Sequence, residues 1–256
     1  MSGGILDLID RLAQRRSARA WSRAGGSAGR IDLAALRGLR TRALQARRGI
    51  DEVVKVADER LAEAAGAAPA LRGPLHADWV WRPRLWAQRL DPVGIAAVEN
   101  RTQYGDATFF HDCRTSELTI RQIRNRRDRT VAPYGLRMEV FGFDGSFLSL
   151  VIDLPAEALA GLKLRHLVRM DCAVEVEKPI QIFVRLNIQH GPNTEQLVRE
   201  LPVSGGEASV EFDLAYTKLN EKRVEKAWID LIFEQPGMNQ IVLRDATFAR
   251  RPRAEL

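Results

Sequence analysis

VRMDCAVEVEKPIQIFVRLNI, residues 168–188, contains two segments in which every second residue is apolar. A side-chain period of two is that of a β-strand, whose successive side chains point to opposite faces of a sheet. Lys178-Pro179 separates the segments, and proline interrupts a strand because it cannot donate a backbone hydrogen bond. The stretch therefore predicts two strands, each with one apolar face: Val168, Met170, Cys172, Val174 and Val176, then Ile180, Ile182, Val184, Leu186 and Ile188.

The same alternation begins after Gly94 and continues to the C-terminus, with one short helical turn at 155–162. Asp144-Gly145 predicts a hairpin turn between two of these strands. Strands without intervening helices exclude a doubly wound parallel sheet, and about eight half-apolar strands need two sheets packed face to face. We therefore predict a mainly β fold, an antiparallel jelly-roll-like β-sandwich over residues 95–256. Its other apolar strand residues are Leu118, Ile120, Leu136, Met138, Val140, Leu148, Leu150, Ile152, Val210, Phe212, Leu214, Ala227, Ile229, Leu231, Phe233, Ile241 and Leu243.

Residues 1–72 predict a basic N-terminal α-helical arm made of two helices with a Gly-rich linker. Apolar residues recur at helical spacing from Ile5 to about Trp21, the linker covers 25–29, and Asp32 is suited to cap the second helix. Residues 1–60 contain 13 Lys and Arg and seven Asp and Glu, whereas the remainder contains 26 of each sign. The net charge of +6 therefore belongs to the arm, which predicts attraction to an acidic surface.

The second helix of the arm carries a seam of small and aliphatic residues at alternating spacings of three and four. Such a seam packs against another helix or surface. Gly38 and Gly49 each weaken the helix by about 1 kcal/mol relative to alanine. We therefore expect the helix to need a partner: the first helix, the sandwich or a second copy of itself. The seam consists of Leu36, Leu39, Ala43, Ala46, Ile50, Val53, Ala57, Leu61 and Ala64.

Residues 73–94 separate the arm from the sandwich and are rich in Pro and Trp. They show no regular period, so we predict an irregular connector and place the domain boundary there. Trp79, Trp81 and Trp86 are expected to dock on the sandwich, because each indole can bury about 150–250 Å².

Three stretches carry a resemblance to known families: HADWVWRPRLW at 76–86, FFHDCRTSELTIRQIRN at 109–125, and the tail from LAYTKLNEKRVEKAWIDLIFE (214–234) to NQIVLRDATFARRPRAEL (239–256). Together they resemble an uncharacterised family of alphaproteobacterial proteins known only as a domain of unknown function, which implies no activity. The tail is also similar to the closing strands of jelly-roll carbohydrate-binding modules and galactose-binding-like domains. This second resemblance implies a fold, and a fold does not fix a function.

The sequence contains no recognisable catalytic or metal-binding signature. Its four histidines are far apart and its two cysteines lack partners at zinc-site spacing, so no metal or other cofactor is expected. We expect a non-catalytic protein. The alternative is a hydrolase that uses His111 or His190, which would need a deep pocket where the histidine meets a carboxylate. Cys172 lies on an apolar strand face and predicts a buried free thiol, while a bridge to Cys113 stays open.

The outward face of the strand at 181–189 is a ladder of planar hydrogen-bonding groups with one aromatic ring. Amide and guanidinium groups bind hydroxyls, and an aromatic ring packs on the apolar face of a sugar. We therefore predict that the sandwich binds a carbohydrate or another polar ligand at this face; the alternative is a solvated sheet surface. The predicted ligand-binding residues are Phe183, Arg185, Asn187 and Gln189 and, from a later strand, Trp228 and Asp230.

A second functional hypothesis assigns the binding to the arm. Arg11, Arg15, Arg16 and Arg19 would contact an anionic membrane, a nucleic acid or an acidic partner. Sequence-specific recognition of nucleic acid is not expected. No signal peptide or membrane span is evident, so the cytoplasm is the expected location, with the periphery of the inner membrane as a variant. The sequence leaves export by another route and the oligomeric state open.

Overall fold

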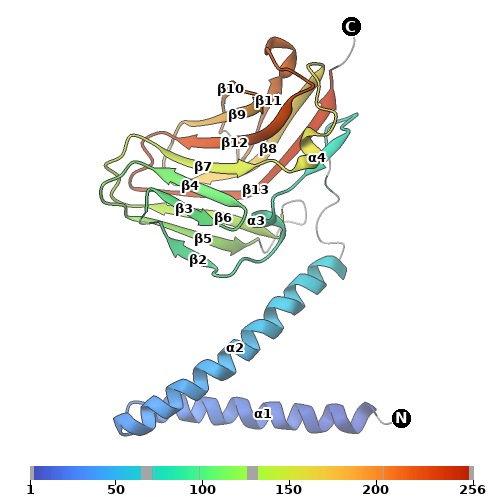
Figure 1. The fold of residues 1–256 in the computed structure, drawn as a ribbon. Coiled ribbons are helices and arrows are strands. Elements are labelled where there is room, and N and C mark those ends of the chain that lie inside the picture. Colours follow the sequence, from blue (N-terminus) through green and yellow to red (C-terminus); the bar gives the residue numbers. More distant parts are fainter. Residues whose placement is uncertain are drawn as a thin grey trace. The chain divides into compact units, whose positions relative to one another are not determined.

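A computed structural model describes the chain over residues 3–64, 71, 73–97, 99–125, 132–203 and 205–253. The chain divides into two compact units, Met1–Asp58 and Glu59–Leu256. The first unit is helical, and the second contains all the described strands (Figure 1). The predicted fold class, a mainly β sandwich with an N-terminal helical arm, is therefore confirmed.

Two long helices, α1 (Gly3–Ser27) and α2 (Leu33–Ala64), form the arm. The predicted end of the first helix near Trp21 is wrong, because α1 continues through Gly25 and Gly26. Glycine is tolerated inside a helix at a cost of about 1 kcal/mol, so these two residues do not end it. The predicted linker is consequently reduced to a tight connection at 28–32.

Asp32 caps α2 as predicted. Its Oδ1 accepts hydrogen bonds from the backbone amides of Ala34 and Ala35 at 3.0 and 2.9 Å. These amides belong to the first turn of the helix, where no backbone acceptor is available, so the carboxylate fixes the helix start.

The second unit consists of two antiparallel sheets (Figure 1). The seven-stranded sheet has the order β11 (Glu207–Asp213), β8 (His166–Val176), β13 (Asn239–Pro252), β6 (Tyr134–Val140), β5 (Leu118–Arg124), β2 (Gly94–Ala96), with β1 (Trp79–Trp81) also paired to β13. The six-stranded sheet has the order β10 (Asn193–Glu200), β9 (Ile182–His190), β12 (Val224–Phe233), β7 (Leu148–Asp153), β4 (Ala107–His111), β3 (Arg101–Tyr104). Short helices α3 (Arg84–Ala87), α4 (Ala156–Leu159) and η1 (Leu214–Tyr216) connect strands.

The core of the sandwich is built from the alternating apolar residues that the sequence indicated. Ile182, Val184 and Leu186 of β9 are fully buried, as is Met170 of β8 in the other sheet. Burying an aliphatic side chain of this size contributes about 1.5–3 kcal/mol. The inward faces of both sheets therefore stabilise the sandwich and leave the alternate residues of each strand for its outer faces.

The Asp144-Gly145 segment does not close a hairpin, so that prediction is wrong. β6 lies between β5 and β13, and both of its edges are already paired. β7 lies in the other sheet, between β4 and β12. The segment therefore carries the chain from one sheet to the other. Asp112 holds it in place by accepting hydrogen bonds from the amides of Ser146 and Phe147 at 2.7 and 3.2 Å.

Residues 73–94 are more regular than predicted, because they contain β1 and α3. β1 pairs with the long strand β13, and a strand of three residues has no period that the sequence could show. The expected docking of the indoles is confirmed. Trp86 of α3 is fully buried, and its Nε1 donates a hydrogen bond to the backbone oxygen of Leu243 at 3.0 Å.

We expect Trp86→Ala to lower the free energy of unfolding by about 3–5 kcal/mol, because it leaves a cavity and an unpaired Leu243 carbonyl. Urea denaturation followed by circular dichroism measures the change. Trp228→Ala is the matched control, since Trp228 is only partly buried on an outer face, and it should cost less than about 1.5 kcal/mol. Equal losses in the two variants would show that Trp86 does not anchor α3.

Candidate ligand-binding site on the six-stranded sheet

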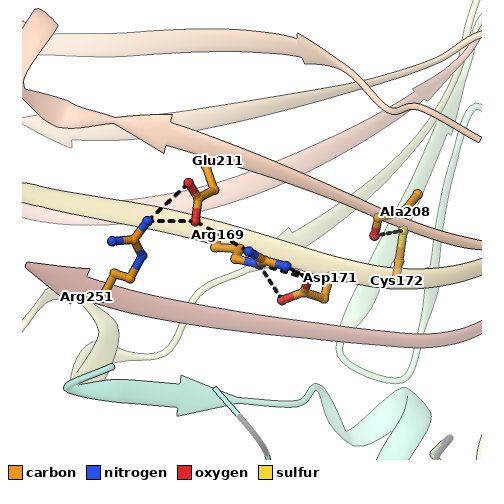
Figure 2. A network of polar contacts seen from close by, with 6 residues as sticks. All are labelled: Arg169, Asp171, Cys172, Ala208, Glu211 and Arg251. Carbon is orange, nitrogen blue, oxygen red and sulfur yellow. Dashed lines mark hydrogen bonds and ion pairs between the residues drawn. The ribbon is translucent and has the colours of Figure 1, made fainter. Parts of the chain in front are cut away.

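The outer face of the seven-stranded sheet carries charged residues that pair with one another (Figure 2). The guanidinium of Arg169 lies 2.9 Å from Asp171, measured from Nε to Oδ1, and 3.6 Å from Glu211. Arg251 reaches the same Glu211 carboxylate at 3.2 Å. Hydrogen bonding to Asp171 is the main cause that raises the pKa of Arg169 above its ordinary value. Because these charges neutralise one another, this network offers little net attraction for a charged ligand.

The outer face of the six-stranded sheet contains a cavity of about 730 Å³. Sites for small ligands typically measure about 300–1,000 Å³. Four adjacent strands, β9, β12, β7 and β4, supply its lining together with one residue that precedes β7. The lining residues are Phe110, Phe147, Ser149, Val151, Asp153, Arg185, Gln189, Lys226, Trp228, Asp230 and Ile232.

The strand register brings these side chains together. Residues directly opposed in an antiparallel pair lie on the same face of the sheet. Asp230 opposes Arg185 of β9 on one side and Val151 of β7 on the other, and Trp228 opposes Asn187. The two strands that carry the predicted ligand-binding residues are therefore neighbours, and their outward residues form rows across the sheet.

Asp230 is only 2% exposed although it lines the cavity. Its Oδ2 accepts hydrogen bonds from Arg185 Nε at 2.7 Å and from Asn187 Nδ2 at 3.1 Å. Its Oδ1 is buried and has no hydrogen-bond partner within the described part of the chain. A buried polar atom left without a partner costs about 1–3 kcal/mol, and more if it is charged. A hydrogen-bond donor supplied by a ligand would remove that cost.

A short chain of side chains orients the Asp230 carboxylate. Gln196 of β10 donates from Nε2 to Asn187 Oδ1 at 3.0 Å, which leaves Asn187 Nδ2 directed at Asp230. Arg185 holds the same carboxylate from the neighbouring position on β9. The carboxylate is thus positioned before any ligand binds, so little side-chain entropy would be lost on binding.

The rest of the lining includes three aromatic rings and two aliphatic side chains beside further polar residues. The ammonium group of Lys226 lies over the ring of Trp228, with Nζ 5.5 Å from the ring centroid. The same Nζ lies 2.9 Å from Asp153 Oδ1. Phe110 and Phe147 add two further rings at the β4 and β7 side. The cavity therefore combines ring surfaces with fixed hydrogen-bonding groups, a combination that suits a ligand with an apolar face and several hydroxyls.

The structure places all six predicted ligand-binding residues on the outer face of one sheet but not all of them in the cavity. Arg185, Gln189, Trp228 and Asp230 line it. Asn187 is fully buried and acts through Asp230, and Phe183 is not among the lining residues. The sequence did not indicate the other lining residues, which are Phe110 of β4, Phe147 just before β7, Ser149, Val151 and Asp153 of β7, and Lys226 and Ile232 of β12.

Comparison with known proteins assigns the chain to a family. Residues 1–256 match the family of unknown function DUF6478. The chain belongs to this family. A search of curated proteins finds no match to the chain.

Solved structures show weak similarity to the DUF6478 chain. The family 11 carbohydrate-binding module from Clostridium thermocellum, in complex with a beta-1,3-1,4-mixed-linked tetrasaccharide, is 11% identical, with 65% of this chain and 100% of that chain covered and a TM-score of 0.40. The enzymatically active domain of tailspike protein 4 from bacteriophage CBA120 is 7% identical, with 62% of this chain covered and a TM-score of 0.41; the DUF6478 chain spans 21% of its length. Similarities at this level do not extend to a ligand or a function.

Neither histidine of the hydrolase alternative lines the cavity of the DUF6478 chain. His111 is buried, and its Nδ1 accepts a hydrogen bond from the amide of Cys113 at 3.3 Å. His190 is also buried, and its Nε2 lies 3.6 Å from the carboxylate of Glu195. That distance is beyond hydrogen-bond reach, and His190 Nε2 has no hydrogen-bond partner among the described residues, so the histidine–carboxylate contact that this alternative requires is not formed at His190.

The arginines of the arm lie on α1. Arg15, Arg16 and Arg19 are exposed, whereas the side chain of Arg11 lies outside the described residues. None of the described helices combines the length and the hydrophobicity that a membrane span requires.

Both cysteines are buried and free. The predicted buried free thiol of Cys172 is therefore confirmed, and Cys172 forms no disulfide bridge with Cys113. Burial raises the pKa of Cys172 from 9.0 to about 12, with Asp171 and Asp245 as lesser causes. Its Sγ lies 3.6 Å from the backbone oxygen of Ala208 (Figure 2). Cys172 is therefore a neutral thiol throughout the physiological pH range.

We expect iodoacetamide at pH 8 to alkylate Cys172 at least about 1,000-fold more slowly in the folded protein than in urea, because only the thiolate reacts and its fraction falls about tenfold for each pH unit by which the pKa rises. Peptide mass spectrometry over a time course measures both rates. A folded-state rate within tenfold of the unfolded rate would contradict the burial of this thiol.

Proposed function

We propose that the sandwich is a non-catalytic binding domain whose six-stranded sheet binds a carbohydrate or a similar polyhydroxylated ligand in the cavity around Asp230. The observation that carries the proposal is Asp230, which lines the cavity and whose buried Oδ1 has no hydrogen-bond partner in the described chain. A ligand hydroxyl is a donor of suitable size for this oxygen.

The remaining lining residues match other parts of a sugar. Arg185 and Gln189 are polar groups beside Asp230, and Arg185 has donors in addition to the Nε that binds the carboxylate. The rings of Trp228, Phe110 and Phe147 offer surfaces for the apolar face of a pyranose. A ligand of this kind would thus contact hydrogen-bonding groups and rings at the same time.

The competing interpretation, a solvated sheet surface, accounts less well for Asp230. A carboxylate on a solvated face keeps both oxygens in water, where each finds hydrogen bonds without a protein partner. Asp230 instead has both oxygens removed from bulk solvent and only one of them paired. The arrangement costs stability and is more readily explained as a feature of binding than of folding.

A glycan array probed with the full-length protein, followed by isothermal titration calorimetry, tests the proposal. We expect at least one neutral oligosaccharide to bind, and Trp228→Ala and Asp230→Asn each to weaken that binding at least about tenfold through loss of a stacking or a charged hydrogen-bond partner.

Phe183→Ala is the matched control for this experiment. Phe183 lies on the same outer face as Arg185 but outside the cavity lining, so the substitution should leave the affinity within about twofold. The proposal fails if the array shows no binding, or if the Phe183 variant loses as much affinity as the two cavity variants.

The exposed arginines of α1 favour a second candidate function, attachment of the arm to an anionic surface. Arg15, Arg16 and Arg19 lie within two turns of one helix, so several can meet one such surface. We expect the full-length protein to co-sediment with vesicles that contain phosphatidylserine at 50 mM salt, and the triple Arg→Gln variant at these positions to lose most of that binding. Equal binding of both proteins would exclude the arm as the contact.

A further inference from the structure

The aliphatic seam of α2 is partly exposed where its side chains are described: Ile50 and Val53 are exposed, and Leu36, Leu39, Ala43, Ala46 and Ala57 are half-buried. The exposed fractions of Ile50 and Val53 are 61% and 69%. Two large aliphatic residues exposed at successive positions of a seam are typical of a helix face that another surface covers.

The spacing of the seam reads the same in both directions. Leu39, Ala43, Ala46, Ile50, Val53 and Ala57 follow one another at intervals of four, three, four, three and four residues. The order of intervals is the same from either end, so the seam of one helix matches the seam of a second helix that runs in the opposite direction. Two copies of α2 can therefore pack against each other in antiparallel orientation with every seam residue facing another.

In antiparallel packing with the two-fold axis at the level of residue 48, large seam residues also face small ones. Ala46 then faces Ile50 of the second copy, Ala43 faces Val53, and Leu39 faces Ala57. Each layer combines one alanine with one larger aliphatic residue, so the layers have similar widths. Parallel packing in register would instead place alanine against alanine and isoleucine against isoleucine in successive layers.

The charges of α2 separate along its length. Residues 33–48 contain five arginines and no acidic residue, whereas residues 49–64 contain five acidic residues and two basic ones. This separation does not compensate the helix dipole, which favours acidic residues near the N-terminus and basic ones near the C-terminus. An antiparallel partner places the net charge of +5 of one half beside the net charge of −3 of the other, while a parallel partner places like charges together.

Gly49 lies next to the proposed axis. Within the described structure, nothing occupies the space where its Cβ would lie. Glycine weakens the helix by about 1 kcal/mol, so its presence at this position needs a reason. Close approach of two helix backbones at the axis supplies one, because a side chain there would hold them apart.

We propose that α2 is a homodimerisation helix that pairs in antiparallel orientation with α2 of a second copy, with the two-fold axis near Arg48. The interface is isologous, because the same seam serves both copies. The inference is independent of the ligand-binding cavity, since it uses only residues of the arm.

Sedimentation equilibrium of the full-length protein between about 1 and 100 μM tests the association. We expect a dimer, and we expect Ile50→Asp to raise its dissociation constant at least about 100-fold, because each dimer then buries two carboxylates beside alanine. Leu44→Asp is the matched control: Leu44 is 38% exposed on the same helix but lies off the seam, so this variant should remain a dimer. Unchanged thermal unfolding of the sandwich in both variants shows that the effect is confined to the arm.

Distances between spin labels determine the orientation. Labels at Arg37→Cys should lie about 35 Å apart in the antiparallel dimer, because the axis near Arg48 places them about 22 residues apart at 1.5 Å per residue. A parallel dimer would bring the two labelled positions to the same level, with their Cβ atoms within about 20 Å, whereas labels at Arg48→Cys, at the level of the axis on the outer side of each helix, give a similar distance in both orientations. The native cysteines are buried and react slowly. A monomeric wild type, a dimer unaffected by Ile50→Asp, or a short distance at residue 37 would each overturn the proposal.

Discussion

The antiparallel pairing of β9 with β12 is the contact on which both the core and the candidate site depend. One register places Leu186 opposite Ile229 on the inner face and Arg185 opposite Asp230 on the outer face. Because the side-chain period of a strand is two, a slip by one residue would turn the aliphatic pair to water and the charged pair into the core. The register that the hydrophobic core requires therefore also determines which side chains line the cavity.

The sequence predicts the parts of this arrangement that are local to a strand. Alternation assigns Ile182, Val184 and Leu186 to the core and Arg185 to the outside, and both assignments are confirmed. Which strands become neighbours is not local, because β4, β7, β9 and β12 come from four distant parts of the chain. The rings of Phe110 and Phe147 could not be placed beside Trp228 for that reason. Asp144-Gly145 was misinterpreted for the same reason, since a turn signal predicts a reversal but not which sheet the next strand joins.

Alternation also predicts which side a residue faces but not how deeply it is covered. Asn187 lies on the outer face as predicted and is nevertheless fully buried, because Gln196 of β10 and Asp230 of β12 both bind its amide. The pairing of polar side chains also differs between the network around Arg169 and the cavity around Asp230. In the network around Arg169 the carboxylates pair with arginines, whereas on the six-stranded sheet one oxygen of Asp230 is left unpaired. Polar side chains on a sheet are thus distinguished by their pairing rather than by their number.

Dimerisation through α2 would raise the overall affinity of the protein for long, repetitive ligands. A cavity that offers a few hydrogen bonds and a stacking surface gives modest affinity for one sugar unit, because much of the contact energy offsets the entropy lost on binding. Two sandwiches joined through their arms carry two such cavities, and the second binding event to a repetitive ligand then becomes intramolecular. Effective concentrations in the millimolar range can raise overall affinity by about 100-fold or more without any additional contact. Such a gain would appear only with ligands long enough to span both cavities, so a dependence of affinity on ligand length would connect the arm to the sandwich.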